Sequence, residues 1–391
     1  MSFTPKAELD RRLATLRQHL AAAGLDGALL HGVTNLFYYT GTAQQGHLWV
    51  PAAGEPVLLV RRVLERARQE SALERLEPLT SLRNLAGQLG GARRIGMELD
   101  ILPVTLFQTY QKALPGAELT DIGAVTRLAR SVKSPYEVEQ IRTAAHMADE
   151  TYRAVQGALR PGITELDLSV VAEAAERRAG HSGALRWRAA TGFECPRVHL
   201  LAGESALAFS FADTPFGGEG LTPAVPYGAG RRVIERGMPV CLDYPTVYGG
   251  YIHDQTRTLA IGGLDAELTR AYEVCREILA ALEAETRPGV TGHELWEKTL
   301  AVAVRHGLEE QYMGCGANRV RFIGHGVGLE LDELPVLAPR QTQVFAAGNV
   351  IAVEPKFFFP GKGAVGLENT YLVTPTGLDR LTVSSDELCV V

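Results

Sequence analysis

The N-terminal third of the chain alternates between helix-like and strand-like patterns. Apolar positions recur with helical spacing over residues 7–23, and short apolar runs typical of strands follow at residues 27–31, 57–60 and 95–97. A further apolar segment, NLFYYTG, occupies residues 35–41. This alternation predicts a sheet layered with helices, and hence an α/β domain.

A long amphipathic pattern separates this region from the rest of the chain. Ser134 and Glu137 form a capping box, and Pro135 suits the first turn of the helix that follows. We place the domain junction just before this helix. The prediction is an N-terminal domain over residues 1–131 and a second, α+β domain over residues 132–391.

The second domain contains an internal sequence repeat. The sequence RPGIT at residues 160–164 recurs as RPGVT at residues 287–291, and each copy follows one long helical pattern and opens another. The matching flanks predict two related halves that face each other, with the ligand site between them.

Two pairs of acidic residues flank predicted hairpin turns. Asp243 and Asp254 lie on either side of the turn at residues 248–250, and a symmetric register places them opposite each other on one face. Glu354 and Glu368 flank the turn at residues 360–362 in the same way. Facing carboxylates repel each other unless a cation lies between them, so a solvated edge pair and a cation site are the two interpretations of each hairpin.

One histidine stands in a glycine-rich run. His325 lies within FIGHGVGL, where glycines let the backbone pass close to a ligand. A lone histidine among apolar residues is more often an ordinary core residue. Together with the four acids, however, it forms an oxygen-rich set that suits two divalent ions of Mn, Co, Fe or Zn.

Composition narrows the class of protein. The acidic excess, with a net charge of −6, weakens the case for a nucleic-acid partner. There is no apolar run of the roughly 18 residues that a membrane span needs, and the charged N-terminus has no hydrophobic signal core. The five widely spaced cysteines fit reduced thiols. We therefore expect a cytoplasmic protein with no membrane partner.

These motifs resemble those of the pita-bread metallopeptidase superfamily, which includes methionine aminopeptidase, aminopeptidase P, prolidase and creatinase. GLDGALL and NLFYYTG are similar to the creatinase-type N-terminal domain, and VKSPYEVEQIR is similar to its junction. The resemblance implies a pita-bread fold for the second domain, a homodimer and a dinuclear site, with manganese the first expectation. The implied metal ligands, which match in order, are Asp243, Asp254, His325, Glu354 and Glu368.

The sequence departs from this family around the implied site. Asp332 stands where a second histidine is usual, Lys356 replaces a glycine, and Gly366 replaces an arginine. A histidine usual before the first aspartate is also missing, and Pro226 or Tyr227 takes its place. An aspartate cannot donate a hydrogen bond at pH 7 unless its pKa is strongly raised.

Several residues are candidates to make up for these losses. Lys356 could supply a positive charge or simply extend to solvent. Tyr227 and His199 lie in a glycine- and proline-rich segment, residues 191–231, which fits either a surface loop or a substrate-facing loop. His199 could equally be an ordinary loop histidine. With Asp332 and Lys356 they form the second tier of candidate catalytic and substrate-binding residues.

The resemblance implies a metal-dependent hydrolase that cleaves Xaa-Pro dipeptides or short peptides. In this interpretation a water attacks the carbonyl, and Glu354 acts as general base in addition to binding metal. A related C–N hydrolase of a small modified amino acid would explain the missing histidines. A non-catalytic binding protein of the same fold is the third possibility.

Overall fold

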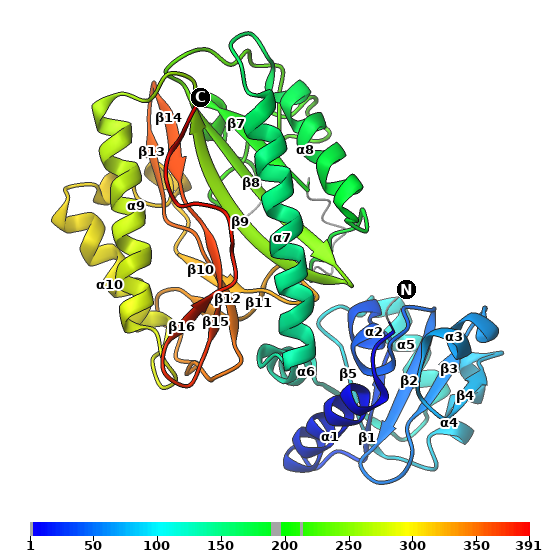
Figure 1. Cartoon of the computed structure of the whole chain (residues 1–391). Coiled ribbons are helices and arrows are strands. Elements are labelled where there is room, and N and C mark those ends of the chain that lie inside the picture. Colours follow the sequence, from blue (N-terminus) through cyan, green and yellow to red (C-terminus); the bar gives the residue numbers. More distant parts are fainter. Residues whose placement is uncertain (1–2, 189–196, 212–213) are drawn as a thin grey trace. The chain divides into compact units, whose positions relative to one another are not determined.

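The computed structural model describes residues 3–188, 197–211 and 214–391. The chain divides into two compact units, one ending at Arg130 and the other beginning at Ser131, with residues 186–188 belonging to the first unit (Figure 1). This division lies next to the predicted junction. Part of the predicted loop at residues 191–231, including Cys195, lies outside the described residues.

The first unit is built on a six-stranded sheet with the strand order β4-β3-β2-β1-β5-β6. Its strands are β1 (Gly27–Leu30), β2 (Gly46–Pro51), β3 (Val57–Val60), β4 (Leu76–Pro78), β5 (Arg94–Met97) and β6 (Glu118–Asp121). Its helices are α1 (Lys6–Ala22), α2 (Val33–Thr40), α3 (Leu64–Glu70), α4 (Leu85–Gln88), α5 (Val104–Ala113) and α6 (Gly123–Ser131). The predicted alternation of helix and strand is confirmed, and the apolar segment at residues 35–41 forms most of helix α2.

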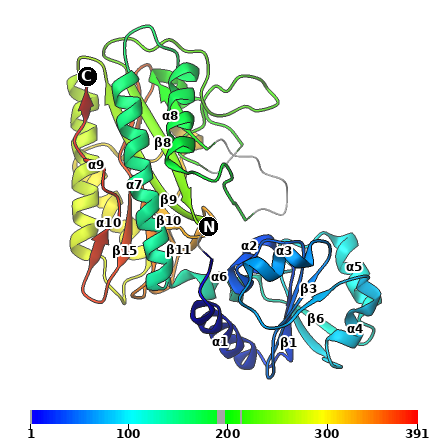
Figure 2. The same ribbon diagram turned by 45° about the vertical axis from the view of Figure 1, so that its right-hand side comes forward.

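The second unit combines two helix pairs with strands that pair antiparallel except for β17 with β9 (Figure 2). Its helices are α7 (Pro135–Ala158), α8 (Glu165–Ala179), α9 (Ala266–Glu285) and α10 (Gly292–Arg305). The first half of the unit contributes β7 (His199–Ala202), β8 (Pro239–Tyr248) and β9 (Tyr251–Ala260). The second half contributes β10 (Gly324–Gly326), β11 (Glu333–Leu337), β12 (Val350–Val353), β13 (Lys356–Phe359), β14 (Gly363–Gly366), β15 (Asn369–Val373), β16 (Leu378–Arg380) and β17 (Cys389–Val390).

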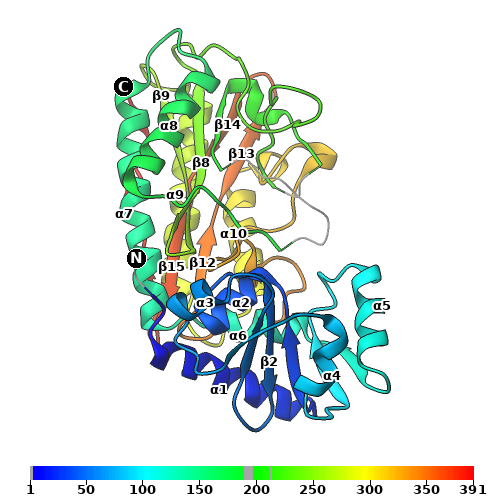
Figure 3. The same cartoon turned by 90° about the vertical axis from the view of Figure 1, so that its right-hand side faces the viewer.

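The strands of this unit form three sheets. One has the order β17-β9-β8-β7, one has the order β11-β10-β12-β15-β16, and the third is the pair β13-β14. β14 lies against β8 and β9, so the two halves of the unit meet along their strands (Figure 3). In the described part of the chain, no helix combines the length and apolar character needed to cross a membrane.

The two copies of the internal sequence repeat make equivalent backbone hydrogen bonds. The motif at residues 160–164 exchanges backbone hydrogen bonds of 2.9 and 2.8 Å with Ile234, and the motif at residues 287–291 exchanges bonds of 3.0 and 2.8 Å with Phe345. The threonine of each motif caps the helix that follows it, α8 or α10. The predicted two related halves are therefore confirmed at the level of individual hydrogen bonds.

Candidate metal centre

The β8–β9 hairpin carries the first two acidic residues. Both lie on the same face, but Asp243 pairs with Thr256 and Asp254 pairs with Pro245. The predicted direct opposition is therefore wrong, because the turn is centred between Gly249 and Gly250 rather than one residue earlier. The shift is by two residues on one strand, so the two aspartates become diagonal neighbours and keep the same face.

The two glutamates lie in the break of a second, longer hairpin. Val353 pairs with Asn369 on one side of the break, and Lys356 pairs with Gly366 on the other. Both ladders follow one register, and a hydrogen bond of 3.1 Å between Leu367 N and Pro355 O bridges the break. The same register places Glu354 opposite Glu368, as the loop length predicted. Leaving the regular ladder at this point lets both carboxylates turn into the unit.

His325 lies on the interior strand β10, between β11 and β12. Its Nε2 atom is 3.7 Å from Glu354 Oε1 and 4.0 Å from Asp254 Oδ2. Its Nδ1 atom is on the other side, 3.1 Å from the Gly326 carbonyl oxygen and 3.5 Å from Asp332 Oδ1. The ring therefore presents Nε2 to the acidic residues while Nδ1 is held from behind, which is the usual arrangement of a metal-ligating histidine.

The five residues come together as two overlapping triads. The ligand atoms of Asp254, His325 and Glu368 all lie within 4.8 Å of one another, and those of Asp243, Glu354 and Glu368 form a second such group. Four of the five side chains are buried, and Asp243 is half-buried. A set of carboxylates and one imidazole fits a divalent transition-metal ion.

One carboxylate oxygen indicates that the first triad is built for a cation. Asp254 is 4 % exposed, and its Oδ1 atom has no hydrogen-bond partner among the described residues. Burial raises the pKa of Asp254 well above its usual range, and the Glu368 carboxylate raises it further. Burial also raises the pKa of Glu368 to about 8, although Lys356 lowers it. A buried anion without a partner is costly, and a bound cation removes that cost.

Lys356 is fully buried among the acidic residues rather than extending to solvent. Its Nζ atom donates to Asp243 Oδ2 at 3.1 Å, forms a very short ion pair with Glu354 Oε2, and lies 3.7 Å from Glu368 Oε2. Its pKa is raised well above the usual range: burial lowers it, but the Asp243 and Glu354 carboxylates outweigh burial. The sequence left open whether Lys356 supplies a positive charge to the site or extends to solvent. The structure places its ammonium group among the acidic residues.

The other second-tier candidates lie at different distances from the acidic residues. Asp332 contacts His325, and its side chain is 41 % exposed. His199 begins strand β7 as the direct partner of Asp243. Burial lowers the pKa of His199, so it is neutral at pH 7. Tyr227 is buried, and its ring packs edge-on against Phe211 at 5.7 Å between centroids.

Sequence reasoning missed the residues that hold the acidic residues of the two triads in place. Thr256 donates from Oγ1 to Glu368 Oε2 at 2.7 Å, and Thr370 donates from Oγ1 to the Asp254 carbonyl at 2.7 Å. The buried Arg257 donates from Nη1 to the Glu368 carbonyl at 2.7 Å. A signal for Thr256 was present, because it follows Asp254 by two residues and therefore shares its face of the strand.

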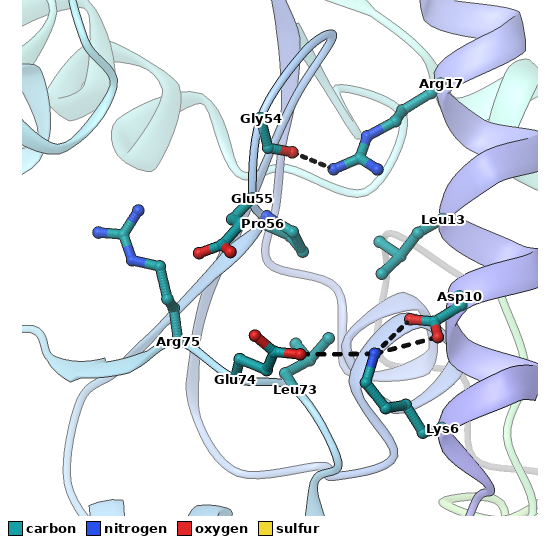
Figure 4. Close-up of a pocket in the computed structure, with 10 residues that line it drawn as sticks. All are labelled: Lys6, Asp10, Leu13, Arg17, Gly54, Glu55, Pro56, Leu73, Glu74 and Arg75. Carbon is teal, nitrogen blue, oxygen red and sulfur yellow. Dashed lines mark hydrogen bonds and ion pairs between the residues drawn. The ribbon is translucent and has the colours of Figure 1, made fainter.

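Two hollows lie in the first unit. One, of about 290 Å³, contains an ion pair between Lys6 and Asp10, and Arg17 donates to the Gly54 carbonyl at its rim (Figure 4). The other, of about 460 Å³, is lined by His31 and other residues of the first unit. No residue of the two triads lines either hollow.

Comparison with known proteins gives two matching family models. Residues 139–375 match the model of metallopeptidase family M24, and residues 12–132 match that of the creatinase/prolidase N-terminal domain. The chain is 28% identical over 386 residues to a peptidase of Bacillus subtilis, YqhT, covering 97% of this chain and 100% of that protein. It is 25% identical to a Xaa-Pro dipeptidase of Pyrococcus horikoshii, covering 97% and 99% of the two chains.

Solved structures give the same result. The Xaa-Pro dipeptidase of Bacillus anthracis has a TM-score of 0.84 at 25% identity, and the comparison covers 98% of this chain and 100% of that one. A prolidase from Pyrococcus horikoshii has a TM-score of 0.81 at 25% identity, with 97% and 99% covered. The similarity therefore extends over both units of the chain.

Proposed function

We propose that this chain, which belongs to the metallopeptidase family M24, hydrolyses the amide bond between an N-terminal residue and proline in dipeptides or short peptides. The observation that carries this proposal is the convergence of four carboxylates and one imidazole from two hairpins and strand β10. The names of the relatives, Xaa-Pro dipeptidase among them, support the substrate class.

The donor set is suited to a divalent metal cofactor. The ligands that we propose are Asp243, Asp254, His325, Glu354 and Glu368, and the unpartnered Oδ1 atom of Asp254 is the strongest support for a cation among them. Manganese is our first candidate, with Co, Zn or Fe as alternatives. When bound, such an ion polarises a carbonyl and makes water a better nucleophile at neutral pH. The sequence predicts two ions. Lys356 bears on this number because its ammonium group lies among three of the five proposed ligands.

The chain's own residues take the remaining roles in this proposal. Glu354 accepts a proton from the attacking water and returns it to the leaving nitrogen. Lys356 holds the Glu354 carboxylate through its ion pair, which fixes the direction of the base. The neutral imidazole of His199, beside Asp243, is the candidate hydrogen-bond partner for the substrate. Tyr227 is a candidate substrate contact in the same segment.

The test is metal analysis followed by hydrolysis assays on the same sample. We expect bound divalent metal and release of proline from Xaa-Pro dipeptides when Mn²⁺ or Co²⁺ is added. Bound metal without proline release from any dipeptide would contradict the proposed substrate. It would favour the alternative, a C–N hydrolase that acts on a small modified amino acid. Absence of metal and of any metal-dependent thermal shift would favour the non-catalytic binding protein.

Three further proposals concern the state of the protein. We propose a homodimer, a cytoplasmic location and a domain division into residues 1–131 and 132–391. Sedimentation velocity tests the first and cell fractionation tests the second. Separate expression of residues 1–131 and 132–391 tests the third, because a domain has its own hydrophobic core and can fold alone.

A further inference from the structure

The ammonium group of Lys356 lies within the second triad of ligand atoms. The three carboxylates that surround it, those of Asp243, Glu354 and Glu368, are the same three that form this triad. A transition-metal ion sits about 2.0–2.2 Å from carboxylate oxygens. An ion bound by these oxygens would therefore have to share their lone pairs with an ammonium that already donates hydrogen bonds to two of them.

The surrounding structure keeps the lysine in this position. Lys356 pairs with Gly366 across the β13–β14 hairpin, and a Cβ atom at position 366 would lie 2.6 Å from Lys356 Cγ. The absence of a side chain at Gly366 is what makes room for the stem of the lysine. On another side the ring of Phe216 lies 4.9 Å from Nζ, a favourable cation–π distance. With no exposed surface, the ammonium has no path to solvent without movement of its neighbours.

The first triad has a different character. Lys356 makes no described contact with Asp254 or His325, and the Asp254 Oδ1 atom has no hydrogen-bond partner among the described residues. One triad thus has a built-in cation, and the other has an open, buried oxygen. The second triad therefore has no need of a further positive charge, whereas the first triad has none, although the two share Glu368.

We propose that this centre takes a single divalent ion, held by Asp254, His325 and Glu368, and that the ammonium of Lys356 takes the place of a second ion among Asp243, Glu354 and Glu368. The inference rests on the proposed function for the identity of the ligands. An ammonium group has three donors and no vacant coordination position. It therefore neutralises and orders these carboxylates permanently, but it offers no second site at which a substrate oxygen or water can coordinate.

The test is the number of metal ions bound per chain. Full-length protein is stripped with a chelator, dialysed against Mn²⁺ and, separately, Co²⁺, and measured by elemental analysis and native mass spectrometry. We expect one ion per chain in the unmodified protein and two in Lys356→Gly. Lys356→Ala, which keeps a Cβ atom on the strand, is a second variant with the same expectation. Lys362→Gly is the matched control, because Lys362 lies in the turn of the same hairpin and pairs with Asp265 at the surface; it keeps one ion.

A second substitution separates failure of this inference from failure of the proposed function. His325→Ala removes a ligand of the first triad only, so it should abolish binding in the native background and leave one ion in the Lys356→Gly background. Two ions in the native chain would overturn the inference while leaving the ligand set intact. One ion in both Lys356→Gly and Lys356→Ala would also overturn the inference. Failure of native protein to bind any metal would overturn both the metal centre and the inference.

Discussion

Glu354 and Glu368 face each other across the break in the long hairpin of the second unit, where the ladders β12–β15 and β13–β14 meet. Both side chains are buried, and both belong to the second triad. They differ in their partners, because Glu354 forms the closest ion pair with Lys356 whereas Glu368 accepts a hydrogen bond from Thr256. The Lys356 ammonium therefore holds the carboxylate of Glu354, the residue that we propose as general base, more closely than it holds that of Glu368.

We expect Glu354→Ala to abolish turnover of Xaa-Pro dipeptides. Loss of a positioned general base lowers rates by about 10²–10⁴-fold, and the substitution also removes the ion-pair partner of Lys356. The measurement is kcat at saturating Mn²⁺, with Glu354→Gln as a variant that keeps the size of the side chain. Glu310→Ala, at an exposed position of the same unit, is the control. Near-normal activity in Glu354→Ala would contradict the proposed role of Glu354 as general base.

Asp332 lies beside the His325 ring, with its Oδ1 atom 3.5 Å from Nδ1. Its carboxylate therefore faces the side of the ring away from the Asp254 and Glu354 carboxylates, which lie near Nε2. Burial lowers the pKa of His325, but the Asp332 carboxylate and two further acids outweigh it and raise the pKa. Outer partners of this kind typically contribute 10–100-fold to metal affinity.

We therefore expect Asp332→Ala to weaken Mn²⁺ binding by about 10–100-fold and to recover its kcat when Mn²⁺ is saturating. Calorimetric titration measures the first effect, and steady-state kinetics at two metal concentrations measure the second. Asp379→Ala, a partly exposed aspartate that pairs with Arg142, is the control. A rise in KM that persists at saturating metal would instead place Asp332 in contact with substrate.

The hairpins show which parts of this centre could be predicted from the sequence. The acids flanking each turn, and the strands around them, follow from local periodicity and turn residues, which are short-range properties. The relation between Asp243 and Asp254 depends on where the turn is centred. A shift of two residues kept the predicted face and changed the predicted partner.

The role of Lys356 depends on contacts that no local pattern describes. Its burial requires a glycine across the hairpin, at position 366, and an acidic neighbour on another hairpin, Asp243. The same long-range dependence applies to Asp332, whose position behind His325 results from the pairing of β10 with β11. Such relations are determined by which strands pair, so they appear only once the fold is known.

Two buried threonines on strand β9 offer a matched pair of substitutions. Thr256 donates to the Glu368 carboxylate, whereas Thr258 exchanges hydrogen bonds of 2.8 and 2.9 Å with the backbone of Gly366. Both are fully buried, and valine has nearly the same shape. Only the first of them contacts a proposed ligand.

Thr256→Val should therefore weaken Mn²⁺ binding by about 10–100-fold, because Glu368 loses the group that orients it. Thr258→Val should leave the affinity unchanged and lower the free energy of unfolding by about 1–3 kcal/mol, since it leaves buried backbone groups without partners. Metal titrations and urea unfolding measure the two effects. Equal loss of affinity in both variants would mean that packing, not the hydrogen bond to Glu368, controls the site.

The first unit should show an acid-sensitive stability that depends on Glu98. This buried carboxylate accepts hydrogen bonds from the backbone N–H groups of His31 and Gly32 at 2.9 and 2.8 Å, and from Asn35 Nδ2 at 2.6 Å. Burial alone would raise its pKa, but the interactions with His31 and Gly32 outweigh burial and lower the pKa from 4.5 to about 2.

Because the folded-state pKa lies below the unfolded value, the ionised Glu98 stabilises the folded unit above about pH 4.5, and this contribution is lost as the pH falls towards 2. A shift of this size corresponds to about 3 kcal/mol. Glu98→Gln should therefore be less stable than the native protein by up to that amount at pH 7, and the difference should narrow below pH 4.5. Urea unfolding followed through Trp49, with the other two tryptophans replaced by phenylalanine, measures it. Glu118→Gln, at an exposed site of the same sheet, is the control. A difference between Glu98→Gln and the native protein that stays constant from pH 7 to pH 3 would show that Glu98 contributes through shape and not through its charge.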